Sequence, residues 1–169
     1  GKMELSRAAI TIMDKICNEP TINFIYLNHH KGMTALEGMA KIASLELLAT
    51  VQWESTNHLN YTPIASKSCN VFTITSLNDF KRIYSLINPQ LFNYHKHFLI
   101  VSINYLPPAH IEQIFNLMWQ KFILNANLIA YDSQDRLAVS TFFPFKAHAC
   151  NDTRPVIVNY FENGEFIHD

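Results

Sequence analysis

The sequence predicts an α/β fold: a largely parallel sheet with helices on both faces, a single Rossmann-like or flavodoxin-like lobe, and an antiparallel hairpin at one edge. Three observations lead to this prediction. Strand-like apolar runs alternate with amphipathic helical segments along most of the 169 residues, at the spacing of βαβ units. Residues 97–103 are nearly continuously apolar, as in a strand buried on both faces. Apolar runs at 128–131 and 137–142 flank a polar turn, which is typical of a hairpin.

The first half of the chain contains both helical and strand-like segments. Apolar side chains recur at helical spacing near the start of the chain, and Pro20 ends that pattern. The elements expected here are a helix at 3–17, a strand at 22–27, a helix from residue 35 opened by a capping box at 34–37, a short strand or helix end at 51–53, and a loop at 54–68.

The second half repeats the alternation more clearly. Ser76 or Asn78 is expected to cap its first helix, and Asn163-Gly164 predicts a tight turn. The elements expected here are a strand at 70–75, a helix at 80–87, a strand at 97–103, a helix from 107 to 123, hairpin strands at 128–131 and 137–142, and a last strand or extended exit segment at 156–160.

The helix expected at 107–123 has the strongest apolar stripe in the chain. Such a stripe is more often core than interface. Trp119 and Phe122 are nevertheless candidates for a subunit interface, because aromatic side chains are enriched at such surfaces.

Composition excludes several classes of function. The net charge is −1 and basic residues are scattered, so the chain lacks the electrostatic footprint of a nucleic-acid-binding protein and has no polybasic patch for a membrane. No apolar run approaches the ~20 residues that a membrane span needs. Charged residues are 16% and aromatics 12%, a balance that suits a large buried face or a partner surface.

The sequence predicts no catalytic, cofactor-binding or metal-binding set. The four glycines form no phosphate-binding loop, and no nucleophile motif is present. Ligands of open α/β sheets bind at the carboxyl ends of strands, where the candidates are His29, His30, Ser76 and 104–105. His95 and His97 would share one face of a strand, but no third zinc ligand is evident, so a solvated turn is the simpler interpretation.

Three cysteines allow three single pairings, with one thiol left over. Cys17 follows an apolar helix, as a buried thiol would, whereas Cys69 and Cys150 lie in polar, loop-like contexts that suit a disulfide. A parallel order in which the strands after Cys17 and Cys69 are neighbours would instead favour a Cys17–Cys69 pair. The residues alone leave the pairing open.

Two sequons make Asn60 and Asn151 candidates for glycosylation, and they give mild support for secretion. Pro63 directly after the first sequon weakens Asn60 as an acceptor.

The C-terminal third resembles the extracellular N-terminal region of insect ionotropic receptors, the chemosensory branch related to ionotropic glutamate receptors. Residues 119–129 resemble that family's helix-then-strand passage. The aromatic-Pro-aromatic run at 141–145, followed by Cys150, resembles its run before a cysteine. Residues 155–166 resemble the segment that leads into the ligand-binding domain. The resemblance spans 115–166, and the earlier part of the chain fits only by its alternation of strands and helices.

The resemblance implies a single extracellular domain at 1–169, with 155–169 as the exit segment toward a later ligand-binding domain. It favours Cys69 as the partner of Cys150. The family's ligand contacts belong to that later domain, so none is assigned here. Membrane contact is expected only through segments downstream.

The function implied is that of a non-enzymatic extracellular module of a chemosensory ligand-gated cation channel subunit, in taste or smell. Such a module acts in subunit assembly or modulation, through co-receptor subunits or self-association. The alternative is a free-standing small α/β protein that binds a small molecule or has weak hydrolase activity near His29 and Ser76.

Overall fold

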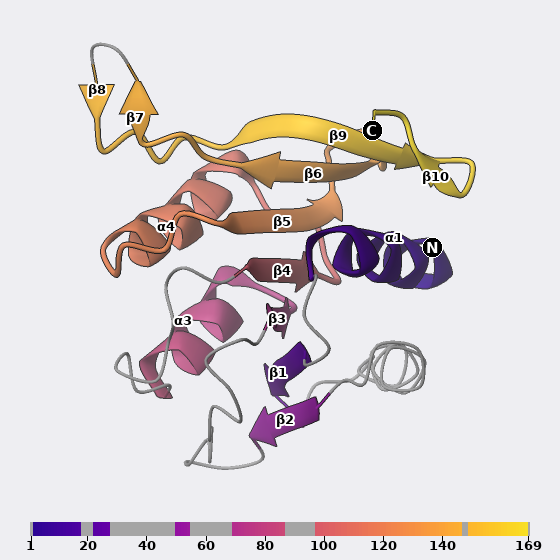
Figure 1. Cartoon of the computed structure of the whole chain (residues 1–169), viewed down its shortest axis with the longest axis horizontal. Helices are drawn as coiled ribbons and strands as arrows, with labels where there is room; N and C mark the ends of the chain where they lie inside the picture. Colours follow the sequence, from indigo (N-terminus) through magenta and orange to yellow (C-terminus); the bar gives the residue numbers. More distant parts are fainter. Residues whose placement is uncertain are drawn as a thin grey trace.

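The computed structural model describes residues 2–17, 22–27, 50–54, 69–86, 97–146 and 149–168. Their strands form an eight-stranded sheet in the order β10-β9-β6-β5-β4-β3-β1-β2, which runs through the whole molecule in Figure 1. A separate two-stranded sheet pairs β7 (Phe145–Lys146) with β8 (Ala149–Cys150). The α/β class, with a sheet that is mostly parallel in its first strands, is confirmed.

The parallel half of the sheet contains β1 (Ile22–Leu27), β2 (Thr50–Glu54), β3 (Cys69–Ile74), β4 (Phe98–Ser102) and β5 (Ala126–Tyr131). Every residue of β3 and β4 is buried, as the continuous apolar run of β4 predicted. The segment at 51–53 belongs to a strand and not to a helix end. Since β1 lies between β2 and β3, the direction of strand order reverses there, as in other doubly wound folds.

The antiparallel half contains β6 (Leu137–Thr141), β9 (Val156–Glu162) and β10 (Glu165–Phe166). β5 and β6 form the expected hairpin. Asn163 and Gly164 both have positive φ, 55° and 82°, so the two residues suit the tight β9–β10 turn that they predicted. Of the two alternatives for 156–160, a strand or an extended exit, the structure shows a strand.

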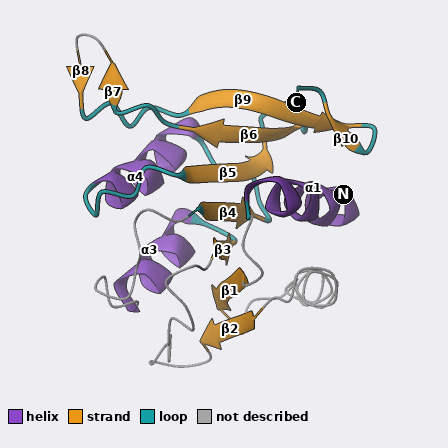
Figure 2. Ribbon diagram, in the orientation of Figure 1, coloured by secondary structure: helices purple, strands orange, loops and turns teal. Residues whose placement is uncertain are grey.

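Helices cover both faces of the sheet. α1 (Lys2–Ile16) packs on one face against the side chains of Val71, Leu99 and Val139, among others. α3 (Leu77–Leu86) and α4 (Pro108–Trp119) contact each other and cover the opposite face (Figure 2). Within the described residues, no helix is both long and apolar enough to cross a membrane.

α4 ends earlier than its apolar stripe predicted. The helix stops at Trp119, and the backbone N–H of Ile123 donates to the carbonyl of Met118 (3.1 Å) while that of Phe122 donates to Trp119 (2.8 Å). These two bonds, with Phe122 at φ 60°, form a Schellman cap. The stripe continues past the helix because Ile123 folds back into the core, where it is fully buried like Met118.

The disulfide joins Cys17 to Cys69, so the pairing of Cys69 with Cys150 that the resemblance favoured is wrong. β1 and β3 are adjacent parallel strands, and Ile22 at the start of β1 lies opposite Cys69. Cys17 follows α1 and precedes β1 in the chain, so it lies near the amino ends of β1 and β3, with a Cα–Cα distance of 5.4 Å to Cys69. Cys150 is exposed and its thiol is free.

Candidate functional site

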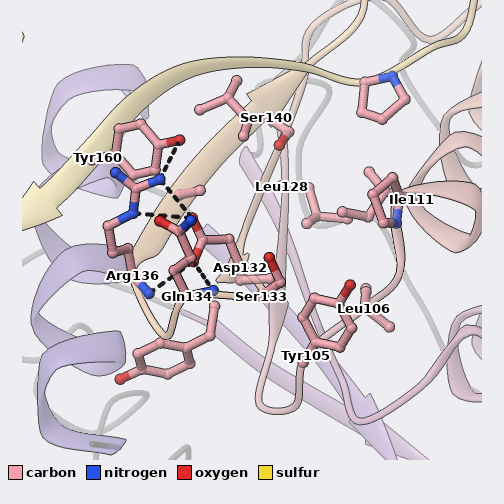
Figure 3. Close-up of a pocket in the computed structure, with 16 residues that line it drawn as sticks. Tyr105, Leu106, Ile111, Leu128, Asp132, Ser133, Gln134, Arg136, Ser140 and Tyr160 are labelled. Atoms are coloured by element: carbon pink, nitrogen blue, oxygen red, sulfur yellow. Dashed lines mark hydrogen bonds and ion pairs between the residues drawn. The ribbon is translucent and has the colours of Figure 1, made fainter.

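A hollow of about 300 Å³ lies where the carboxyl end of β5 meets the start of α4. Its walls come from the loop before α4, the turn between β5 and β6, and the adjoining strand β9. In Figure 3, Ile111, Leu106 and Tyr105 lie on one side of the hollow, while Arg136, Asp132 and Tyr160 lie on the other. The hollow therefore has an apolar wall and a polar wall.

The apolar wall is part of the core on the α4 face. Leu106, Leu128 and Ala130 are buried members of that core, and Ile111 on α4 packs against it. Ala138 and Ser140, on the same face of β6, continue the floor toward Ile157 of β9, which is 48% exposed. The hollow exists because α4 begins beside β5. The helix therefore does not cover this face of β6 and β9.

The polar wall is a cluster of Asp132, Arg136 and Tyr160. The backbone N–H groups of Gln134 and Arg136 each donate to Asp132 Oδ1 (2.9 Å). The Arg136 guanidinium lies 3.2 Å from Asp132 Oδ2 and donates to the Tyr160 hydroxyl (3.3 Å). Its central carbon also lies 4.3 Å from the centroid of the Tyr160 ring. The turn thus fixes the guanidinium against the ring of β9.

The Asp132 carboxylate is held in its ionised form. Partial burial alone would raise its pKa, but the N–H donors of Arg136 and Gln134 and the charge of Arg136 outweigh burial and lower it below its usual value. A carboxyl with a lowered pKa is a poor general acid near neutral pH. The cluster is suited to hold a polar group of a ligand rather than to transfer a proton.

A second hollow of about 350 Å³ adjoins the first across Tyr105 and Leu106. It lies between the ends of β3 and β4 and includes Ser76. The backbone N–H of Asp79 donates to Ser76 Oγ (3.2 Å), while the Asp79 carboxylate accepts from the backbone and hydroxyl of Thr75. Ser76 is therefore the helix cap of α3, one of the two caps expected.

The structure brings some of the predicted residues together and separates others. Ser76 and Tyr105 line one hollow, and Asn104 donates to the Thr75 carbonyl (3.2 Å) beside them. His29, His30, His95, the capping box at 34–37 and Asn60 lie outside the described residues. Trp119 and Phe122 lie at the opposite end of α4, where Trp119 Nε1 donates to Asn151 Oδ1 (2.8 Å).

Sequence reasoning missed the Asp132–Arg136–Tyr160 cluster. The turn at 132–135 was predicted, but no interaction partner was predicted for the charged side chains of Asp132 and Asp135. Tyr160 reaches the cluster because Tyr160 of β9 pairs with Ala138 of β6, a contact between residues 22 positions apart that no local pattern shows. The spacing of Asp132 and Arg136 across a tight hairpin turn was the one signal available.

The described residues offer no metal centre: no three His, Cys, Asp or Glu side chains among them come together as ligands. What they offer is an amphipathic hollow, at the lower end of the 300–1,000 Å³ typical of small-molecule sites.

Comparison with known proteins gives one family. A family model described as "Putative ionotropic receptor, ligand binding domain" matches residues 3–169. Searches of curated proteins and of solved structures return no significant match. The matched region contains every described helix and strand except Lys2, the first residue of α1. Because the match covers nearly the whole chain, this protein belongs to the ionotropic receptor ligand binding domain family.

Proposed function

We propose that this domain is a non-enzymatic extracellular module of a chemosensory, ligand-gated cation channel subunit, which acts in subunit assembly or modulation. The observation that carries the proposal is the family match over residues 3–169. The buried Cys17–Cys69 disulfide supports an extracellular location, because such bonds persist in oxidising compartments. The use of the Ser76 hydroxyl as a helix cap weakens the alternative of a free-standing hydrolase.

An intact-mass measurement tests the location. The chain is expressed through a secretory pathway, and its free thiols are alkylated without reductant. We expect one alkylated thiol, at Cys150, and one disulfide. Three alkylated thiols in the folded protein would remove the support for an extracellular domain.

The outer edge of β9 is the surface that best supports assembly. β9 pairs with β6 along one side, but β10 covers only Phe161 and Glu162 on the other. Within the described residues, this leaves the edge at 156–158 without a strand partner. Ile157 is 48% exposed and Val158 39% exposed, and an open apolar edge is a template for pairing with another chain.

The assembly role is tested by placing a charge on this edge. We expect Val158→Lys to abolish co-purification with co-expressed subunits of the same receptor, because Lys on an edge strand opposes strand pairing. Leu124→Lys is the matched control, since Leu124 is a comparably exposed apolar residue (41%) between α4 and β5, outside β9. Equal association of Val158→Lys and the unmodified chain would contradict assembly through β9.

A second candidate function is recognition of a small ligand by this domain itself, which the amphipathic hollow favours. The matched family is described as ligand binding, although the resemblance placed ligand contacts only in later segments. The occupant would be a small molecule with one polar end toward Arg136 and Tyr160 and an apolar body toward Leu106 and Ile111.

Thermal shift against a panel of small amphipathic molecules tests this candidate. Any compound that raises Tm should lose most of its effect in Arg136→Gln, and part of it in Tyr160→Phe, which removes one hydroxyl. Lys121→Gln, at an exposed position beyond the far end of α4, controls for the loss of a positive charge. A shift that survives in Arg136→Gln would place the ligand elsewhere.

A further inference from the structure

We infer that Asn151 carries an N-linked glycan whose first sugar packs on an aromatic surface made by Trp119, Phe122 and Phe145. This surface is called the Trp119 cluster below. The inference rests on the extracellular location in the proposed function, because the modification requires the secretory pathway. The exposed aromatic rings at this end of the molecule would then be covered by a sugar that is covalently attached to the same chain.

Asn151 lies at the base of the β7–β8 hairpin, formed by Phe145–Lys146 and Ala149–Cys150. Its backbone N–H donates to the Pro144 carbonyl (3.1 Å), and its φ of 71° gives it the left-handed conformation that Asn tolerates. The side chain is exposed, and its Oδ1 accepts from Trp119 Nε1 (2.8 Å). This bond holds the side-chain amide beside the indole, and Nδ2, the atom that would carry the sugar, is bonded to the same carbon as Oδ1.

The rings around Asn151 form one continuous surface. Trp119 contacts Phe145 edge to face at 5.3 Å between ring centroids, and Phe122 at 6.3 Å. Phe145 lies directly opposite Cys150 in the hairpin, one position before Asn151. Phe145 and Phe122 are each 68% exposed, which is high for aromatic rings with a large hydrophobic area.

Phe122 is a second sign that the surface has an occupant. It takes the positive-φ position of the Schellman cap, where Gly is preferred because a side chain there is strained. An aromatic ring kept at a strained and exposed position indicates a role at the surface rather than in the core.

A sugar fits this surface better than a protein partner does. The acceptor asparagine is hydrogen-bonded to the central ring, so a glycan on Asn151 begins within the cluster and needs no separate affinity to stay there. The apolar C–H face of N-acetylglucosamine suits an aromatic ring, and its polar edges remain in water. A bulky glycan here would also keep another subunit away from Trp119 and Phe122, in contrast to the interface expected from their sequence.

The transfer takes place before the domain folds, because the hydroxyl-bearing Thr153 of the sequon is buried in the folded chain. The donor is an oligosaccharide linked to a lipid pyrophosphate. The C1–O bond to the pyrophosphate breaks, a C1–N bond to Asn151 Nδ2 forms, Nδ2 loses one proton, and the lipid pyrophosphate leaves. Folding then brings the attached sugar to the Trp119 cluster.

The test uses the whole chain with Asn60→Gln, so that any sugar is on Asn151. Three samples are compared: the chain from a eukaryotic secretory pathway, the same material trimmed by an endoglycosidase to one N-acetylglucosamine, and the chain from bacterial periplasm, which forms disulfides without adding sugar. We expect a mass that shows one glycan, equal Tm for the first two samples, and a Tm lower by roughly 2–4 °C for the third.

Phe145→Ala should reduce that Tm difference to near zero. Phe143→Ala is the matched control, because it removes an exposed ring from the same segment but outside the Trp119 cluster, and it should leave the difference unchanged. A glycan that leaves Tm unchanged would overturn the packing of the sugar on the Trp119 cluster. Loss of subunit association in Phe122→Ala would then indicate that a protein partner covers these rings.

Two mass results separate this inference from the proposed function. Unmodified Asn151 in secreted protein with the Cys17–Cys69 disulfide formed would overturn the glycan alone. Unmodified Asn151 with the thiols of Cys17 and Cys69 free would overturn both.

Discussion

The two faces of the sheet are closed in different ways. On one face, among the described residues, α1 covers aliphatic side chains of the strands, and the Cys17–Cys69 bond ties the end of that helix to β3. On the other face two helices, α3 and α4, cover a core rich in aromatic rings. Phe72 stacks with Phe98, and Phe115 with Phe142. One face therefore combines an aliphatic core with a covalent bond, whereas the other has an aromatic core.

The difference shows where this fold can carry a site. α4 covers part of its face and leaves hollows at its start and exposed rings at its end. Both features lie where helical cover stops. The α1 face holds a core from Leu5 to Phe161, and its hollow of about 280 Å³ lies where the end of α1 meets β9 and β10.

The largest expected effect on stability is on the face of the sheet that α3 and α4 cover. Phe115 is fully buried, and its ring centroid lies 4.9 Å from that of Phe142. We expect Phe115→Ala to lower the free energy of unfolding by about 3–5 kcal/mol, because it removes a large ring and leaves a cavity. Urea denaturation measures the change, with Phe143→Ala as the exposed control. A loss below about 1 kcal/mol would show that this face does not depend on its aromatic packing.

Removal of the disulfide tests the other face. The bond closes a loop with a sequence separation of 52, for which the chain-entropy model gives about 4 kcal/mol. We expect Cys17→Ala combined with Cys69→Ala to cost about 2–5 kcal/mol and to make stability insensitive to reductant. Because the disulfide and Phe115 belong to separate core clusters on opposite faces of the sheet, this loss should add to that of Phe115→Ala within about 0.5 kcal/mol. Strong non-additivity would mean that the two faces are coupled.

A smaller effect is expected at the polar wall of the hollow. Asp132 is 17% exposed, and Asp132→Asn should cost about 0.2–1 kcal/mol at neutral pH, the range for such ion pairs. Because folding lowers the pKa of Asp132, its contribution is present above the unfolded value of about 3.9 and is lost as pH falls through the folded value. The difference between the unmodified chain and the variant should therefore shrink in acid. A difference that grows in acid would contradict this.

The smallest effect is expected at the cap of α4. Phe122→Gly should raise the free energy of unfolding of the unglycosylated chain by up to about 1 kcal/mol, because Gly takes a positive φ without strain. Differential scanning calorimetry of the bacterial protein measures it, with Phe122→Ala as the control that keeps the strain. Destabilisation by Gly would show that the ring contact with Trp119 outweighs the strain.

Much of the fold could be predicted because the relevant signals are local. The continuous apolar run of the fully buried strand β4, the hairpin at Asp132 and the Asn163-Gly164 turn all follow from short stretches of sequence. The end of α4 could not, because Ile123 continues the helical stripe although it reaches the core by a different backbone path.

The candidate site and the disulfide were harder to predict because they depend on which strands are neighbours. Tyr160 reaches Arg136 only through the pairing of β9 with β6. Cys17 reaches Cys69 only through the pairing of β1 with β3. Trp119 belongs to the helical stripe that predicted a core. Its contact with Phe145 could not be predicted, because it depends on the β7–β8 hairpin lying beside α4.

The Cys17–Cys69 bond also changes what a protease can do to this domain. A single cut of the backbone anywhere between the two cysteines would leave both fragments joined as one molecule. The N-terminal helix would stay attached to the sheet, and the nicked protein would migrate as a single species until a reducing agent separated it. A domain cut once in that interval would therefore stay in one piece for as long as the disulfide is intact.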